Sequence, residues 1–503
     1  MERRSQGTVI LAAMIAATAL AMLAPAAVGF TLREHAIARA FVYSGALLGG
    51  IAMLVHLANR AEPVSKPRFS HPFVYLSAAY LILPALMAIP LTEAVPGMRF
   101  FDAWFEMISA FTTTGASLID PEASRSIHLW RATVAWGGGL FLMVAVMALL
   151  APLRLGGFEL YGSDAGQPRA AESWQASRLR RAQIDEAYHD KSLHRMAQQI
   201  KLIAPVYLSV TLALWVGLSM AGNPPVLALI LAMSTVSTSG IAPGGSLGGL
   251  AAEMLIAAGL ILALSRQFWP GAQVIRQGKR RMLHDPEPLL ASLLVLVLLG
   301  VLGLRAMAAP LDPGYGARLA ELWGIVFTSL SFLTTAGFVS EVGRSAEGVY
   351  FGAAGVVLLA LALCGGGVAT TAGGLKLMRV FALMWQARRE MDKLVYPDSV
   401  GGDGIRLRGL RREGAHAAWL FVMIFIFSLT ALTAALTLTG VTMEDAMIYA
   451  TAALTTTGPV AQMTGPDPLS WAALGDTAKA ILALGMILGR LELLLLLSLF
   501  WRR

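Results

Sequence analysis

Apolar residues in this chain are gathered in long runs that short polar or basic segments separate. Ten of these runs approach the roughly 20 residues that a helix needs to cross a bilayer. They cover residues 9–28, 37–57, 73–91, 127–150, 203–221, 247–264, 289–308, 349–364, 417–440 and 478–500. Lipid cannot satisfy backbone polar groups, and barrel strands would alternate over about 10 residues, so the runs predict membrane-spanning helices.

Four shorter amphipathic segments lie between pairs of these runs and are too short to cross a bilayer. They cover residues 101–111, 226–236, 319–333 and 443–454. Each is followed by a segment of small, mostly hydroxyl-bearing residues that ends in glycine: Thr112-Thr113-Thr114-Gly115, Ser237-Thr238-Ser239-Gly240, Thr334-Thr335-Ala336-Gly337 and Thr455-Thr456-Thr457-Gly458. Four copies in the same hydropathic setting predict that one chain builds a structure with fourfold pseudo-symmetry.

Hydrophobic residues make up 56% of the chain and charged residues 14%, whereas about 25% of the residues in an average soluble domain are charged. The net charge is +8, and most basic residues lie in segments 169–201, 276–281 and 376–412 and at the two ends. If each run crosses once, these segments share one side, which is the cytoplasm by the positive-inside rule. Basic residues spread over juxtamembrane loops disfavour nucleic-acid binding. We expect a multi-pass protein of the bacterial inner membrane with both termini cytoplasmic.

With both termini inside, the four glycine segments enter the membrane from the outer face and return. Irregular backbone at that depth is tolerated only inside protein or along a water-filled cavity. Glycine accepts a positive φ, and each preceding half-helix directs its partly negative C-terminus inward. Rings of backbone carbonyls can replace the hydration shell of potassium. The four segments therefore predict a cation path that binds potassium at these residues, with no catalytic site and no cofactor in this chain.

A glycine-rich segment interrupts the apolar character of the chain at residues 365–374. A continuous helix would be weak there. An unwound loop below the glycine segments that obstructs the path is one interpretation. Close packing of helices through small residues is the other, and the residues alone favour neither.

Arg490 lies within the last apolar run. A charge deep in a span costs about 2.5–3.5 kcal/mol on insertion scales, so it usually faces a cavity or a partner. We favour an electrostatic barrier beneath the glycine segments. The alternatives are an ion pair with Glu492 or another carboxylate, and an extended side chain that reaches the inner surface.

Several of these segments resemble those of TrkH-type subunits of the Trk/Ktr/HKT superfamily. Besides the four glycine segments, residues 105–111 are similar to that family's first pore helix, residues 365–376 to its intramembrane loop, and residues 489–492 to a motif in its last span. The likeness runs from about Phe69 to the end, and the two extra N-terminal spans resemble TrkH rather than shorter members.

The resemblance implies an all-α polytopic membrane protein. Four channel-like repeats of outer helix, pore helix and inner helix would surround a pseudo-fourfold pore, with two extra N-terminal transmembrane helices. The expected division is an N-terminal two-span domain at 1–68, repeat 1 at 69–155, a cytoplasmic connector at 156–200, repeat 2 at 201–285, repeat 3 at 286–412 and repeat 4 at 413–503.

The resemblance further implies potassium uptake through a backbone-carbonyl selectivity filter, which the four glycine segments would form. The expected gate residues are Gly365, Gly366, Gly367, Thr370, Thr371, Gly373, Gly374, Lys376 and Arg490. It also implies a homodimer and a cytoplasmic TrkA-type regulatory subunit that docks on segments 156–201 and 379–412. NAD or ATP would bind only that partner.

An alternating-access symporter that moves potassium with sodium or protons is the second hypothesis. Such carriers usually have paired repeats, and fourfold repetition with short half-helices argues against one. Two features depart from the expected pattern in the glycine segments: Ala336 lacks a hydroxyl, and Pro459 removes an amide after the fourth glycine. Residues 265–270 are also unlike the family. We therefore expect selectivity to be less strict than in a strong potassium channel.

Overall fold

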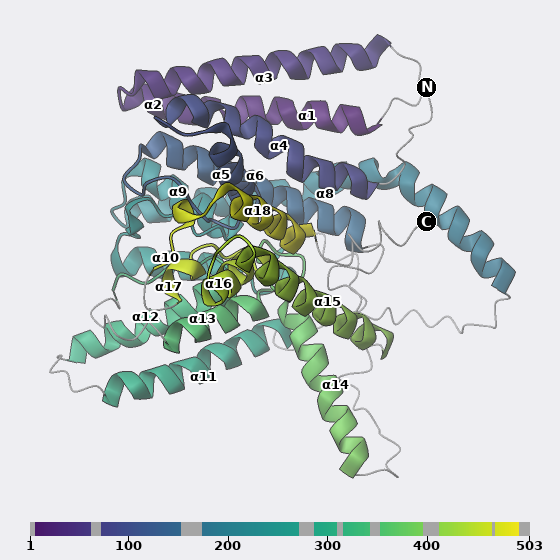
Figure 1. Ribbon diagram of the computed structural model, residues 1–503, viewed down its shortest axis with the longest axis vertical. Coiled ribbons are helices and arrows are strands. Elements are labelled where there is room, and N and C mark those ends of the chain that lie inside the picture. The colour runs from purple at the N-terminus through teal and green to yellow at the C-terminus, as the bar shows by residue number, and fades with distance from the viewer. Residues whose placement is uncertain are drawn as a thin grey trace.

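The computed structural model describes residues 6–61, 72–151, 174–270, 286–308, 315–342, 353–395, 412–464 and 468–491. Within these ranges all regular structure is helical, and Figure 1 shows most helices running in nearly the same direction. Seven helices in the described part are long and apolar enough to cross a bilayer. The all-α membrane architecture expected from the apolar runs is confirmed.

The N-terminal helices form a layer on one side of the bundle. α1 (Gln6–Ala21) and α3 (His35–Ala61) lie side by side, with α2 (Leu23–Thr31) between them in the chain (Figure 1). The first apolar run is thus divided into α1 and α2. Pro25 explains this locally, because a proline has no N–H to donate to the carbonyl four residues earlier.

Four repeats of three helices make up the rest of the bundle. The outer helices are α4 (Pro72–Ala94), α8 (Trp174–Met220), α11 (Pro286–Ala308) and α15 (Arg412–Thr437). The half-helices are α5 (Phe100–Phe111), α9 (Pro225–Ser237), α12 (Tyr315–Leu333) and α16 (Met443–Leu454). The inner helices are α6 (Arg125–Ala145) with its π-helical extension η1 (Val146–Leu150), α10 (Gly249–Ile261), α13 (Ala353–Cys364) and α18 (Asp476–Leu491). The predicted half-helices are confirmed, although α12 begins four residues earlier than expected.

Two repeats show that the inner helix meets the half-helix in the same way. A Cβ atom on Gly138 of α6 would collide with the carbonyl oxygen of Phe111, the last residue of α5. A Cβ atom on Gly489 of α18 would collide with that of Leu454, the last residue of α16. Small residues let helix backbones approach this closely in membranes. The repeats therefore share tertiary contacts as well as helix order.

The inner helix α10 is shorter than its apolar run predicted, whereas α13 ends at Cys364, where its run was expected to end. Gly365, with a φ of 71°, ends α13, and α10 gives way to a turn after Ile261. The two breaks fit together, because the Gly367 N–H donates to the Ala263 carbonyl at 3.0 Å. The glycine-rich segment predicted the break after α13, whereas hydropathy misses the break after α10, since apolar and small residues form it.

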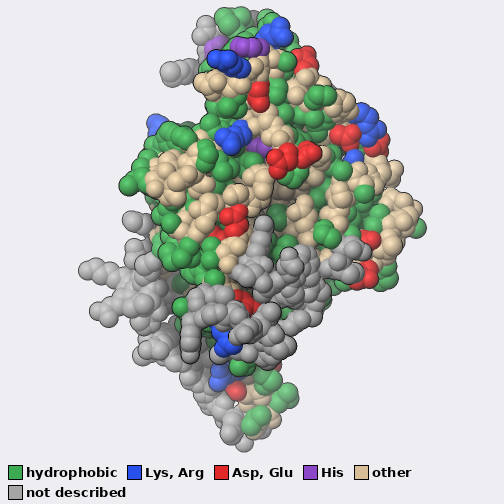
Figure 2. Space-filling view, turned by 90° about the vertical axis from the view of Figure 1, so that its left-hand side faces the viewer, with side chains coloured by type: hydrophobic (Ala, Val, Ile, Leu, Met, Phe, Trp, Pro, Cys, Tyr) green, Lys and Arg blue, Asp and Glu red, His purple; other side chains and the backbone are tan. Residues whose placement is uncertain are grey.

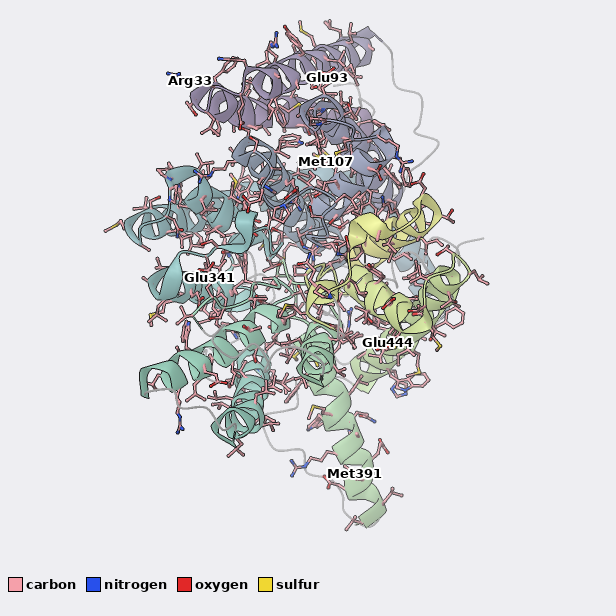
Figure 3. The ribbon with its side chains drawn as sticks, turned by 60° about the vertical axis from the view of Figure 1, so that its left-hand side comes forward. Arg33, Glu93, Met107, Glu341, Met391 and Glu444 are labelled. Atoms are coloured by element: carbon pink, nitrogen blue, oxygen red, sulfur yellow. The ribbon has the colours of Figure 1, made fainter. Side chains whose placement is uncertain are left out.

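Four short helices and one amphipathic helix complete the description. The short ones are η3 (Pro243–Gly245), η4 (Arg266–Phe268), η7 (Trp471–Ala473) and α17 (Val460–Met463), which is a single turn. α14 (Leu377–Val395) extends away from the bundle, and Figure 3 labels Met391 on this projecting part, whereas Met107 lies inside the bundle. Figure 2 shows the side of the molecule on which α9 and α17 lie in Figure 1. Acidic and basic side chains lie among apolar ones on this face.

The expected division at residue 200 falls inside α8, which runs without a break from Trp174 to Met220. Residues 152–173, in the expected connector and regulatory surface, lie outside the described residues, as do 396–411 and Glu492.

Candidate functional site

Each half-helix ends in the glycine segment that the repeat pattern singled out. We name these segments loop 1 (residues 112–115), loop 2 (237–240), loop 3 (334–337) and loop 4 (455–458). The second residue of each loop has a left-handed backbone, with φ values of 56°, 52°, 57° and 54° at Thr113, Thr238, Thr335 and Thr456. This conformation costs a residue with a β-carbon about 1–2 kcal/mol. The four loops therefore share the same unfavourable torsion at their second residue.

Loops 1, 2 and 3 contact one another in order. A Cβ atom on Gly115 would collide with the carbonyl oxygen of Ser239, and one on Gly240 would collide with that of Ala336. Both glycines also have positive φ values, 76° and 67°. Only glycine meets both requirements, so carbonyl oxygens of one loop lie directly against the backbone of the preceding loop.

Loop 4 closes the ring. A Cβ atom on Gly337 would lie 2.8 Å from the Cγ atom of Pro459, which follows loop 4. The Gly458 N–H donates to the Thr114 carbonyl of loop 1 at 2.6 Å. The four loops therefore surround one axis in the order 1, 2, 3, 4.

Hydroxyl groups of the loops point mainly toward the half-helices. The first hydroxyl of each loop donates to the carbonyl four residues earlier, at 2.7–2.9 Å, from Thr112, Ser237, Thr334 and Thr455. The third hydroxyl lies 2.8–3.3 Å from the first in loops 1, 2 and 4, at Thr114, Ser239 and Thr457. The third side chain of each loop therefore faces the half-helix and not the axis, so the missing hydroxyl at Ala336 does not change the lining of the axis. The loop backbones face one another around the axis.

Sequence reasoning missed a set of serines that hold the loops. Ser109, Ser234 and Ser331 each lie six residues before the loop glycine. The Oγ atom of Ser234 accepts from the Ile241 N–H at 2.7 Å, and that of Ser331 accepts from the Phe338 N–H at 2.6 Å. The shared spacing of six residues is the signal that would have found them.

In loop 1 the same bond runs in the opposite direction, because Ser109 donates its hydroxyl to the Ala116 carbonyl at 2.7 Å. The fourth repeat has Ala452 and Pro459 at the two matching positions. Alanine has no hydroxyl and proline no N–H. Both partners of the bond are therefore missing from loop 4.

Buried carboxylates hold the chain that leaves the ring. Glu106 of α5 is fully buried, pairs with Arg131 of α6 and accepts from the Leu118 N–H at 2.7 Å. Glu253 of α10 accepts from the backbone N–H of Glu341, in the chain after loop 3, at 2.6 Å. Buried charges are tolerated when they are paired or hydrogen-bonded in this way. These carboxylates therefore hold the backbone that follows loops 1 and 3.

The glycine-rich loop (residues 365–376) separates α13 from α14 and is not helical. Thr371 donates to the Val236 carbonyl at the end of α9 at 3.1 Å, and the Gly373 N–H donates to the Thr335 hydroxyl of loop 3 at 2.7 Å. A Cβ atom on Gly373 would collide with the Thr455 carbonyl of loop 4. The glycine-rich loop therefore crosses directly beneath the ring.

Arg490 links this loop to the ring. Its side chain is 3% exposed, and its Nη2 atom donates to the Thr113 hydroxyl at 2.5 Å and to the Thr371 carbonyl at 2.6 Å. These partners are neutral oxygens. The alternative of an ion pair with Glu492 concerns a residue outside the described ranges.

Two cavities flank the ring and differ greatly in size. A cavity of about 470 Å³, which we call the entrance cavity, is lined by all four loop glycines together with His128, Arg131 and Trp471. The cavity on the other side holds about 20 Å³ and is lined by Gly373, Lys376 and Arg490. That is room for about one water molecule. The space beside the ring is therefore wide on one side and nearly filled on the other.

The expected gate residues gather on the nearly filled side. Thr370, Gly374 and Arg490 line the small cavity, and Gly365 lies against the backbone of Gly374. Lys376 is buried and donates to the Ala372 carbonyl. Gly366 and Gly367 instead pack against the backbone of Ala263 and Leu264, in the turn that follows α10. The structure thus brings the expected residues together in one continuous layer.

Known proteins match this chain in family, sequence and fold. The family model of TrkH, described as cation transport protein, matches residues 37–181 and 326–501. The Trk system potassium uptake protein TrkI of Halomonas elongata is 27% identical and covers 93% of this chain and 91% of its own. TrkH of Vibrio parahaemolyticus is 27% identical over 98% of both chains. The crystal structure of the potassium transporter TrkH from Vibrio parahaemolyticus covers 99% of this chain and 100% of its own, with 25% identity and a TM-score of 0.76. The chain belongs to the TrkH family of cation transport proteins.

Proposed function

We propose that this protein takes up potassium across the bacterial inner membrane through a pore on the axis of the four loops. The contact of loop 1 with loop 2, of loop 2 with loop 3 and of loop 4 with loop 1 carries the proposal. Carbonyl oxygens from different repeats converge there, as an ion without its water shell requires. Relatives that match nearly the whole chain are named as potassium uptake proteins.

In this proposal the glycine-rich loop is the gate. It touches loop 3 and loop 4 and, through Arg490, loop 1. An ion that leaves the ring would meet this backbone and a positive charge. Two like charges 4 Å apart repel by about 4 kcal/mol at an effective dielectric constant of 20. Uptake therefore requires the loop and Arg490 to move away from the axis.

The gate would be controlled through α14. This helix begins at Leu377, directly after Lys376 of the glycine-rich loop. It exposes the side chains of Met384 near its middle and of Met391 and Leu394 near its far end. A displacement of α14 would therefore move the loop. We assign segments 156–201 and 379–412, the second of which includes most of α14, to the docking of a cytoplasmic TrkA-type subunit. NAD or ATP would bind that subunit, and the protein itself would form a homodimer.

Uptake of ⁸⁶Rb⁺ into liposomes that contain the purified protein tests the function. We expect uptake that excess external potassium suppresses more strongly than sodium, without any requirement for a sodium or proton gradient. A fixed stoichiometry with sodium or protons would instead support the alternating-access symporter. Empty liposomes and liposomes with the heat-denatured protein are the controls.

A further inference from the structure

The chain around loop 4 differs from the other three loops in its path. The glycines of loops 1 to 3 have left-handed φ values, whereas Gly458 does not. Non-helical chain follows loops 1 to 3, but Pro459 has a right-handed helical backbone and directly precedes α17. Because the serine bond of the other repeats is missing here, loop 4 turns in a different direction as it leaves the ring.

This turn carries the Pro459 ring across the axis. Loop 4 has loops 1 and 3 as neighbours, and loop 2 lies opposite. The Cγ atom of Pro459 is nevertheless 3.0 Å from the position of a Cβ atom on Gly240 of loop 2. The same Cγ atom is 2.8 Å from the position of a Cβ atom on Gly337. The Cδ atom of Pro459 is 3.8 Å from the position of a Cβ atom on Gly115. A side chain this close to all three other glycines occupies the centre of the ring.

We propose that Pro459 closes the entrance of the pore, as a second barrier opposite the glycine-rich loop. The proposal rests on the proposed function. The ring of Pro459 faces the entrance cavity together with the loop glycines. A pyrrolidine ring offers no oxygen to replace ion-bound water, so a potassium ion cannot pass while the ring is in place.

Loop 4 also lacks the serine bond that ties the other three loops to their half-helices. The Thr457 N–H donates to the Ala452 carbonyl at 2.9 Å, and the Gly458 N–H donates to the Thr114 carbonyl of loop 1. The carbonyls of Thr457 and Gly458 accept from the N–H groups of Val460 and Ala461, both at 3.2 Å, so loop 4 and α17 are bonded to each other. A displacement that withdraws the proline ring therefore moves loop 4 together with α17 and breaks its bond to Thr114, without breaking a serine bond.

Replacing Pro459 tests the barrier. Initial ⁸⁶Rb⁺ uptake is measured for the full chain in liposomes with Pro459→Ala, both alone and combined with Arg490→Ala, so that the inner barrier does not mask the outer one. We expect uptake to rise at least threefold in one or both backgrounds. Pro121→Ala is the matched control. Pro121 lines the same cavity, but none of its atoms is among those nearest to a Cβ position on a loop glycine.

A second variant restores the missing bond. Ala452→Ser combined with Pro459→Ile reproduces the pair Ser234 and Ile241 of repeat 2. Ile241 lines the entrance cavity, but its side chain is buried in a cluster with Leu129 and Ile230 and is not among the atoms nearest to the loop glycines. We expect the double variant to take up rubidium as fast as Pro459→Ala. The barrier is refuted if both variants, as monodisperse protein, take up rubidium no faster than the protein without the change at Pro459, both with and without Arg490→Ala. That result would leave the proposed function standing. Absence of specific rubidium uptake in every variant would refute the proposed function, and the barrier with it.

Discussion

Arg490 and Thr113 are hydrogen-bonded at 2.5 Å although 377 residues separate them in the chain. Thr113 belongs to loop 1 of the first repeat, and Arg490 lies on the inner helix of the last repeat. The same guanidinium group donates to Thr371 of the glycine-rich loop. One side chain thus joins the ring of loops to the backbone that obstructs its lower side.

Arg490→Ala should raise the basal flux of potassium without a regulatory subunit. The change removes a positive charge from the path and releases the Thr371 carbonyl. A barrier lower by about 1.4 kcal/mol corresponds to a tenfold faster flux, and we expect an increase of this order in ⁸⁶Rb⁺ uptake. Arg490→Lys keeps the charge and should stay near the wild-type rate. Equal or lower flux in folded Arg490→Ala protein would remove the barrier role.

Gly115→Ser should lower the preference for potassium over sodium. Its Cβ atom would displace the Ser239 carbonyl and widen the ring at one point. Gly97→Ser is the control, because Gly97 has the same φ of 76° but no atom within 4 Å of the added Cβ. We expect a several-fold fall in the permeability ratio for the first variant only. An unchanged ratio for Gly115→Ser would contradict the assignment of loop 1.

Gly373→Ala should destabilise the obstructing position of the glycine-rich loop. The added methyl group would collide with the Thr455 carbonyl, so the loop has to move away from loop 4. The expected result is faster ⁸⁶Rb⁺ uptake in folded protein. Gly137→Ala, a helical glycine with open space around its Cβ position, serves as the control. Slower uptake by Gly373→Ala than by the wild type would show that the loop does not obstruct the path.

Ser331→Ala should weaken the ring itself. The Phe338 N–H would lose its acceptor inside the protein, which costs about 1–3 kcal/mol. We expect a lower melting temperature and less stabilisation of the purified protein by potassium chloride relative to choline chloride. Ser292→Ala, at an exposed serine of α11, should change neither. If both variants melt alike, the serine does not support the loop.

Repetition and hydropathy predicted the half-helices and the four loops, because each copy places the same residue types in the same setting. The interruption at Gly365 was also predictable, since glycine is a poor helix former. The matching break after α10 was not, because it depends on how Ala263 and Gly367 meet across two repeats. Local residue types do not report such long-range contacts.

The asymmetry of loop 4 was partly predictable. The absence of an amide at Pro459 follows from the sequence, but the direction of its ring does not. That direction depends on the simultaneous absence of a hydroxyl at Ala452 and on the helical backbone that leads into α17. Likewise, Arg490 could be placed in the membrane from the sequence, whereas its partners Thr113 and Thr371 required the structure.

Anomalous diffraction from crystals of this protein grown with Tl⁺ or Rb⁺ in place of potassium tests the central claim most directly. The account predicts anomalous density on the common axis, within coordinating distance of carbonyl oxygens from several loops, and its loss in Gly115→Ser. Density found only away from the axis, while the four loops keep their arrangement, would contradict the claim that these loops bind the transported ion.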